Sequence, residues 1–185
     1  VVGGNALAPE AEQRTPDHLR KIQLIFQNPD DSLNPRQTIA QILEQPLKLY
    51  FGLMGDALHQ RSAEILDRVR LGAHYLDRLP SQLSGGEKQR VAIARAFAAE
   101  PDLVLCDEVT SALDVSVQAA VLDLLNDLKA TQGTTYVFVS HDLAVVRALS
   151  DRVAVLYQGR LCELGLSADA YATPSHPYTE VLLGA

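Results

Sequence analysis

The chain has 185 residues, 47% of them hydrophobic and 21% charged, which suits a folded protein with one sizeable core and excludes an intrinsically disordered one. The formal net charge of −7 argues against a broad nucleic-acid-binding surface, so we expect no nucleic acid as a partner. No apolar run approaches the about 18 residues that a membrane-spanning helix needs, and no signal peptide opens the sequence, so we expect a cytoplasmic protein.

The first quarter of the chain predicts loops followed by a strand. Residues 1–20 hold turn-forming residues among polar ones, which predicts loops and short extended pieces: Gly3, Gly4, Pro9 and Pro16. The apolar residues at 22–26 predict a short buried strand, which ends at Gln27. A glutamine at the end of a strand is ordinary by itself.

Between residues 38 and 80, apolar residues recur at the spacing of an α-helix: Ile39, Ile42, Leu43, Ile65, Leu66 and Val69. Three breakers, Pro46, Gly52 and Gly55, predict separate short helices. His59 and His74 have no second ligand-type residue at metal-binding spacing, so we interpret both as surface residues.

The stretch Leu83–Arg90 predicts the start of a helix. Ser84 followed by Glu87 has the form of a capping box, in which each side chain satisfies a backbone N–H of the first turn. Gly85 and Gly86 leave such N–H groups uncovered, so the helix could offer an anion bare amides and the positive end of its dipole. A capped helix alone, however, is usually only a helix start.

Two further strands predict a polar edge. The apolar run at 103–106 suits a strand buried on both faces, and Asp107 and Glu108 follow at its carboxyl end. Ligands of open α/β sheets bind at this edge, where one carboxylate could hold Mg²⁺ and the other deprotonate water. The alternative is a solvated turn. A second strand at 135–139 delivers His141 to the same edge, although a lone histidine there is more often structural.

The other segments predict structural elements. An amphipathic helix follows Asp114 and stops near Gly133, and residues 153–164 predict a hairpin whose turn uses Gly159 for a positive φ. Cys106 and Cys162 lie in apolar strand-like runs, which predicts buried reduced thiols rather than a disulfide or metal site.

A nucleotide site at the sheet edge of Asp107 and Glu108 would also need a phosphate-binding loop. The P-loop pattern needs Gly-Lys-Ser/Thr, because backbone amides wrap the phosphates while the lysine and the hydroxyl reach their oxygens and Mg²⁺. None of the four lysines follows a glycine: Lys21, Lys48, Lys88 and Lys129. The printed residues therefore contain no Walker A motif.

The order of the motifs resembles the ATP-binding subunits of ABC transporters. LSGGEKQR, LVLCDE and SALD occur in the order of the family's signature, Walker B and D-loop, with Val109 where the family usually has proline. The resemblance implies an α/β fold with a P-loop NTPase-like, mostly parallel sheet flanked by helices. It places sheet portions at 1–34 and 101–172, an inserted helical subdomain with the signature helix at 35–100, and a tail at 173–185. The family's first strands and P-loop precede the matched segment, so we expect the C-terminal part of a nucleotide-binding domain, inactive by itself.

Two segments indicate a subfamily. IFQNPDDSLNPRQTI resembles the Q-loop of dipeptide and oligopeptide importers, and Pro174–Thr179 resembles their PxHPYT segment. No cysteine supports a metal site at His176. The resemblance covers residues 21–182.

The resemblance also implies roles for individual residues, with ATP and Mg²⁺ as cofactors. It makes Glu108 the catalytic carboxylate and His141 the switch that contacts the γ-phosphate, and it assigns Mg²⁺ to Asp107 and Gln27. The nucleotide contacts that it implies, several of them to a partner subunit's ATP, are Gln27, Ser84, Gly85, Gly86, Gln89 and Asp114. It further implies transmembrane permease subunits, a second nucleotide-binding subunit and, indirectly, a substrate-binding protein, at the inner face of the cell membrane.

Two alternatives stay open. One is an ABC ATPase that acts on DNA or ribosomes, which the importer-like Q-loop, the acidic charge and the HPYT tail disfavour. The other is a nonhydrolytic scaffold fragment, which suits a chain without Walker A.

Overall fold

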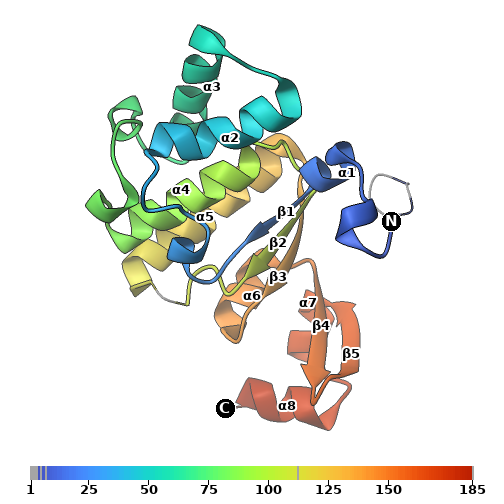
Figure 1. Cartoon of the computed structure of the whole chain (residues 1–185). Coiled ribbons are helices and arrows are strands. Elements are labelled where there is room, and N and C mark those ends of the chain that lie inside the picture. Colours follow the sequence, from blue (N-terminus) through green and yellow to red (C-terminus); the bar gives the residue numbers. More distant parts are fainter. Residues whose placement is uncertain (1–3, 5, 7, 112, 185) are drawn as a thin grey trace. The chain divides into compact units, whose positions relative to one another are not determined.

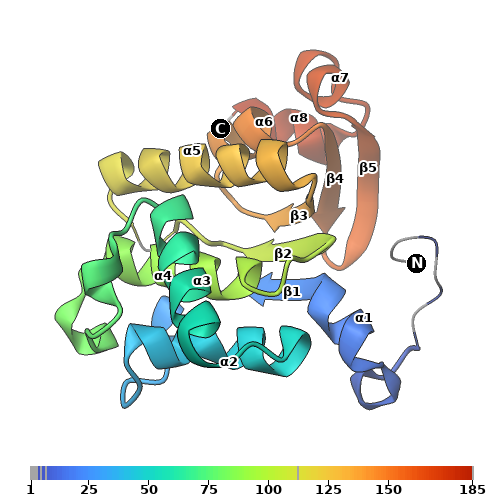
Figure 2. The same cartoon turned by 90° about the horizontal axis from the view of Figure 1, so that it is seen from above.

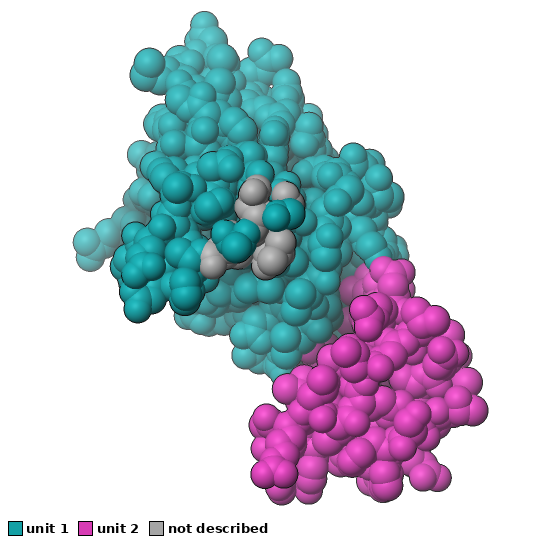
Figure 3. Space-filling model, turned by 90° about the vertical axis from the view of Figure 1, so that its right-hand side faces the viewer, with its two compact units in different colours: residues 1–139 teal, residues 140–185 magenta. Residues whose placement is uncertain are grey.

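The computed structural model describes residues 4, 6, 8–111 and 113–184. These residues form two units, residues 1–139 and residues 140–185 (Figure 3). The sheet portion predicted at 101–172 thus extends over both units.

The first unit is built on a parallel sheet in the order β1 (Ile22–Ile25), β2 (Leu103–Asp107), β3 (Thr135–Val139). Alternate residues of the strands point to one buried face, where Ile25, Cys106 and Phe138 lie in register. That face packs on α4 (Gly85–Phe97) and α5 (Val115–Gln132), which lie side by side (Figure 1, Figure 2). The predicted parallel α/β fold is therefore confirmed. The prediction that the strands at 22–26 and 103–106 are fully buried is wrong: on the opposite face of the sheet Leu24 is 36% exposed and Leu105 is only half-buried.

The two cysteines differ in environment. Cys106 lies in β2 and is fully buried, and this burial raises the pKa of its thiol to about 12. Cys162, which was also predicted to be buried, is only half-buried on β5 (Arg160–Leu166). Because the thiolate is the reactive form, Cys106 is chemically inert at neutral pH.

The prediction of loops and extended pieces over residues 1–20 is wrong in part. The short helices η1 (Ala11–Gln13) and α1 (Pro16–Lys21) occur there, while Gly3 lies outside the described residues. The Thr15 side chain accepts a hydrogen bond from the His18 N–H, and Pro16 occupies the first helical position. Proline is favoured there because that position has no intrahelical use for an N–H group.

The prediction that Pro46 separates two helices is wrong. Helix α2 (Ile39–Phe51) runs through Pro46 and ends at Gly52, which has a φ of +64°. A proline removes one intrahelical hydrogen bond, but the buried side chains before and after it, Leu43 and Leu47, hold both halves in the core.

The helical region continues with helix α3 (Gly55–Arg68) and then the short helices η3 (Ala73–Tyr75) and η4 (Pro80–Gln82). Helices α2 and α3 pack on each other and on α4. The remaining short helix of this unit, η2 (Pro29–Asp31), follows β1.

Helix α3 ends in a Schellman motif that has an arginine in the position usually taken by glycine. The Leu71 N–H donates to the Leu66 carbonyl and the Arg70 N–H to the Asp67 carbonyl, both at 2.9 Å. Arg70 has a φ of +60°, and its guanidinium pairs with Asp127 of α5 at 2.6 Å. Arg70 thus has an unfavourable backbone conformation, which glycine would adopt without strain, and its side chain forms an exposed ion pair.

We expect Arg70→Gly to be more stable than Arg70→Ala by about 1 kcal/mol, because both remove the ion pair and only glycine adopts this φ without strain. Urea unfolding of the two variants measures the difference. Arg68→Gly and Arg68→Ala, two residues earlier and inside the helix, are the control, and there we expect alanine to be the more stable residue. Equal stability of Arg70→Gly and Arg70→Ala would contradict the expectation.

The second unit contains α6 (Leu143–Leu149), a hairpin of β4 (Arg152–Tyr157) and β5, and then α7 (Ser167–Ala172) and α8 (Pro177–Gly184). The predicted hairpin is confirmed, with φ of +75° at Gly159. Gln158 beside it has a φ of +48°, which the sequence did not indicate. Two consecutive positive φ angles are typical of the type I′ turn, whose twist matches that of the strands.

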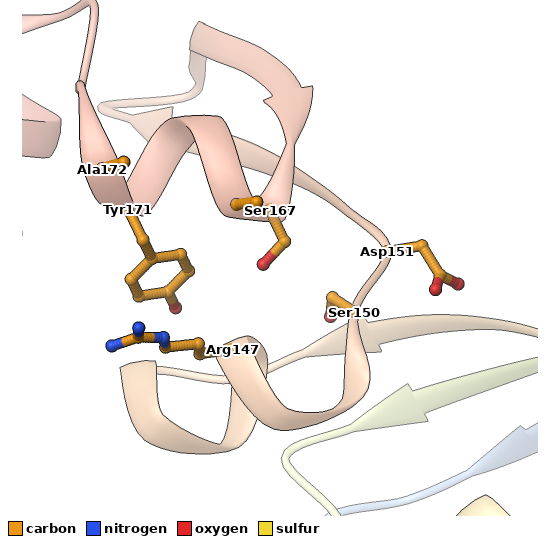
Figure 4. A pocket seen from close by; sticks show the side chains of 7 residues that line it. Arg147, Ser150, Asp151, Ser167, Tyr171 and Ala172 are labelled. Atoms are coloured by element: carbon orange, nitrogen blue, oxygen red, sulfur yellow. The ribbon is translucent and has the colours of Figure 1, made fainter.

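A pocket of about 490 Å³ lies between α6 and α7 (Figure 4). Arg147 and Tyr171 face each other there, with the guanidinium carbon 5.5 Å from the ring centroid, whereas the Asp151 carboxylate points away. The Tyr171 hydroxyl donates a hydrogen bond to the Leu143 carbonyl at 2.6 Å. These contacts hold α7 against α6.

The HPYT segment is anchored to the hairpin through Glu163 of β5. The Glu163 carboxylate accepts hydrogen bonds from the backbone N–H groups of Ser175 (3.0 Å) and His176 (3.3 Å). The His176 Nδ1 accepts from the Tyr178 N–H at 3.1 Å, and the Tyr178 ring lies 4.2 Å from that of Tyr157. The segment therefore begins α8 and has a structural function.

We expect Glu163→Ala to release α8, because it removes both acceptors from the N–H groups. The nearby Thr179 hydroxyl, which makes no hydrogen bond of normal geometry among the described residues, and the two bonded N–H groups lower the pKa of the Glu163 carboxyl from its ordinary value of 4.5. The anchor should therefore be complete above about pH 4.5 and be lost as the pH falls through the lowered pKa. Limited proteolysis at pH 7 measures the release, and Glu180→Ala in the same helix is the control. Equal protection of both variants would contradict the anchoring role.

Candidate functional site

The carboxyl ends of β1 and β2 bring together two predicted site residues that lie far apart in the sequence. The Gln27 Nε2 donates hydrogen bonds to the Glu108 Oε2 at 2.8 Å and to the Ser111 Oγ at 3.1 Å. Asp107, the last residue of β2, is exposed beside them. Because its Nε2 is turned to Glu108, Gln27 keeps its Oε1 as an acceptor or metal ligand.

The backbone at Glu108 is strained and held in place. Its φ of +45° lies in the left-handed region, which costs a non-glycine residue about 1 kcal/mol. The Glu108 N–H donates to the Val139 carbonyl at 2.9 Å, and the Ser111 N–H and hydroxyl both donate to the Glu108 carbonyl at 3.0 Å. Val109, the departure from the family pattern, is 1% exposed and fills a core position. The turn thus fixes the carboxylate at the sheet edge.

The predicted capping box at the start of α4 is confirmed. The Ser84 Oγ accepts from the Glu87 N–H at 3.4 Å, and the Glu87 Oε2 accepts from the Ser84 N–H at 2.7 Å. Ser84 and Gly85 are exposed. The positive end of the helix dipole is therefore accessible to an anion.

The two glycines of this helix start differ. A Cβ on Gly86 would lie 2.5 Å from the Cγ1 of Val117, in the first turn of α5, whereas a Cβ on Gly85 would have no atom within 4 Å. Asp114 caps α5 by accepting from the Val117 N–H at 3.0 Å, and this bond holds the pKa of its carboxyl below the usual value. Gly86 is thus required for the packing of two helix starts, and Gly85 is open to a ligand.

Ser84 and Gly86 open into a pocket of about 430 Å³ whose other walls come from α4, α5 and the loop after α3. Basic side chains line it, namely Arg70, Arg90 and His74, and so does Tyr75. Sequence reasoning assigned none of these residues to the site. The position of Arg90, one turn after Gly86 on the same helix face, was the available signal. Nothing in the local sequence indicated Arg70 or Tyr75.

Gln89, which was predicted to contact the nucleotide, is buried in the core. Its side chain is 1% exposed, and its Nε2 has no hydrogen-bond partner among the described residues. Gln89 shares a face of α4 with Ala92, Ile93 and Ala96, all buried. Helix periodicity therefore turns it into the core, and it presents no atom to the pocket that Ser84 lines.

His141 belongs to the second unit, where it is exposed and precedes α6. The Asp142 carboxylate next to it caps α6 and accepts from the N–H groups of Ala144 and Val145. The contact of His141 with Glu108 and a γ-phosphate stays a prediction.

The described residues contain neither a membrane-spanning helix nor a complete metal site made of side chains alone. None of their helices is long and apolar enough to cross a membrane. They also contain no cluster of three His, Cys, Asp or Glu side chains that could hold a metal ion without other ligands. Mg²⁺ commonly takes only one or two carboxylates and completes its shell with water and substrate phosphates, so Asp107 and Gln27 fit this ion as partial ligands.

The parallel sheet with a Gln-Glu pair at its edge, and the capped Gly-Gly helix start, define an ATP-binding-cassette type of α/β domain. The dimeric ATP-binding cassette MJ0796, solved in a post-hydrolysis state with ADP and Pi, is 34% identical, has a TM-score of 0.70 and matches 82% of this chain and 65% of its own. CbiO1 from Clostridium perfringens is 29% identical with a TM-score of 0.72, over 84% of this chain and 61% of its own. The family model described as ABC transporter matches residues 2–111, and the chain belongs to this family.

Relatives in the family include ATP-binding proteins of peptide transport. The dipeptide transport ATP-binding protein DppF of Haemophilus influenzae is 47% identical over 166 residues, which are 90% of this chain and 51% of that protein. The oligopeptide transport ATP-binding protein OppF of Bacillus subtilis is 41% identical over 99% of this chain and 60% of that protein. The chain thus spans about half of the length of the curated relatives that it matches.

Proposed function

We propose that the protein binds and hydrolyses ATP and thereby energises an importer for peptides or related solutes. The observation that carries the proposal is the Gln27–Glu108 hydrogen bond of 2.8 Å at the carboxyl edge of a parallel sheet. The names of the relatives, dipeptide and oligopeptide transport ATP-binding proteins, support the kind of solute. The printed residues contain no Gly-Lys-Ser/Thr, so we expect these 185 residues alone to bind ATP weakly.

The side chains at the sheet edge divide the chemistry. Glu108 is positioned to accept a proton from an attacking water, and Gln27 holds the carboxylate and orients that water. Asp107 and the Gln27 Oε1 would hold Mg²⁺, whose chemistry is to neutralise charge on the phosphates. The role of His141 is to contact the γ-phosphate.

Two subunits complete each site in this proposal. Ser84 and Gly85 of one subunit, at the exposed start of α4, contact the phosphates of the ATP held by the other, with Gly86 and Asp114 supporting them. The nucleotide-binding subunits dock on transmembrane permease subunits at the inner face of the membrane. A substrate-binding protein acts on the permease and reaches the ATPase only indirectly.

Reconstitution tests the proposal. The protein is incorporated with its permease into vesicles, and ATP hydrolysis is measured with and without peptide-loaded binding protein. We expect peptide to stimulate hydrolysis. Stimulation by DNA or ribosomes without the permease would favour the non-transport alternative, and absence of nucleotide hydrolysis under every condition would favour a scaffold.

A further inference from the structure

The Glu87 carboxylate, in the first turn of α4, accepts hydrogen bonds from two segments of the chain. Its Oε2 accepts from the Ser84 N–H at 2.7 Å and from the Ser84 hydroxyl at 2.8 Å. Its Oε1 accepts from the hydroxyl of Tyr75, which lies in η3, before the signature. The Tyr75 ring also contacts the His74 ring, with the centroids 4.6 Å apart, and the Arg78 guanidinium carbon, which lies 4.3 Å from its centroid. Both Tyr75 and Glu87 are half-buried.

This arrangement conflicts with a phosphate contact by Ser84. A serine hydroxyl has a single proton, and here Ser84 donates it to Glu87. A phosphate oxygen only accepts hydrogen bonds, so Ser84 must turn its proton away from Glu87 before it donates to phosphate. Glu87 then loses one donor and presents a negative charge close to the incoming phosphate.

We infer that Tyr75 is a positioning residue for the signature, which holds the Glu87 carboxylate while the Ser84 hydroxyl turns to phosphate. This inference rests on the proposed function of Ser84. The Tyr75 hydroxyl bonds to the oxygen of Glu87 that Ser84 does not use, so its bond survives the change. It draws the negative charge toward η3 and away from the phosphate.

The protonation of the pair agrees with this role. The Tyr75 hydroxyl, followed by the Ser84 N–H, holds the pKa of the Glu87 carboxyl below its usual range, and the bond to Glu87 raises the pKa of Tyr75. Glu87 is therefore a carboxylate and Tyr75 a phenol at neutral pH. The other titratable or charged side chains around them are Arg78, which contacts Tyr75, and Arg70, His74 and Arg90, which line the same pocket.

A double-mutant cycle with Tyr75→Phe and Glu87→Gln tests the inference in the protein assembled with its permease. We expect Tyr75→Phe to lower kcat/KM for ATP about tenfold, the effect of one hydrogen bond to a charged group. Glutamine at position 87 keeps the capping box but carries no charge. We therefore expect the double variant to regain most of the activity that Tyr75→Phe loses, and Tyr50→Phe in α2 to behave like the parent protein.

Two results separate the inference from the proposed function. If Tyr75→Phe is equally damaging in the parent and in the Glu87→Gln variant, or has no effect in the parent, the positioning role of Tyr75 is wrong while the proposed function stands. If Ser84→Ala hydrolyses ATP at the parent rate, the proposed role of Ser84 fails, and the inference fails with it. The urea unfolding midpoint of each variant is measured as a control. A midpoint within error of the parent's shows that the change in kcat/KM does not reflect misfolding.

Discussion

Glu108→Gln should lower ATP hydrolysis by about 10² to 10⁴-fold while ATP binding persists, which is the usual contribution of a general base. An amide fills the same space but cannot accept the proton of water. The amide oxygen of glutamine can still accept the hydrogen bond that the Gln27 Nε2 donates to Glu108, so the geometry of the sheet edge should survive. Phosphate release and binding of a fluorescent ATP analogue, measured on the protein assembled with its permease, separate the two effects.

A matched control exists in the same chain. Glu100 also has a left-handed backbone, with φ of +50°, and its exposed carboxylate pairs with Arg61. Glu100→Gln therefore changes the charge and the backbone preference in the same way as Glu108→Gln, but away from the Gln27 contact. We expect it to hydrolyse ATP at the parent rate. Turnover by Glu108→Gln close to that of Glu100→Gln would show that Glu108 is not the catalytic carboxylate.

Gly85→Asp should weaken ATP-dependent dimerisation by at least about 100-fold. A carboxylate at the start of α4 would face the phosphate of the partner's ATP, and two unit charges 4 Å apart repel by about 4 kcal/mol at an effective dielectric constant of 20. Position 85 is the suitable one because an added Cβ meets no atom within 4 Å, whereas one on Gly86 meets Val117. Analytical ultracentrifugation with ATP measures dimerisation. Gly86→Ala should instead reduce the stability of the protein.

Mixing two variants tests whether the site is shared between subunits. In a dimer of one Gly85→Asp subunit and one Glu108→Gln subunit, one composite site carries both defects and the other carries neither. We expect the mixed dimer to hydrolyse ATP although each variant alone does not. Failure of the mixture, or loss of ATP binding by monomeric Gly85→Asp, would place the signature in the pocket of its own subunit.

The sequence by itself determined the elements whose stabilising contacts are local. The capping box joins Ser84 to Glu87 three residues later, and the hairpin turn requires a positive φ at Gly159, so spacing and residue type were sufficient. The strand at 103–106 was recognisable from its continuous apolar run, but only one of its faces, that of Val104 and Cys106, is buried. The family resemblance placed Gln27 and Asp107 at one Mg²⁺ site, but the direct hydrogen bond of Gln27 to Glu108 came only from the tertiary structure, since strand periodicity does not specify which strands pair.

Only the tertiary structure decided which residues surround these elements. Helix α2 continues through Pro46 because core packing outweighs one missing hydrogen bond. Gln89 is buried because its helix face turns to the core. Arg70 meets Asp127, and Tyr75 meets Glu87, through contacts between separate segments that leave no periodic pattern in either one. Local spacing therefore specified the start of α4 and the turn of the hairpin, whereas the composition of the pocket depended on how the chain brings distant segments together.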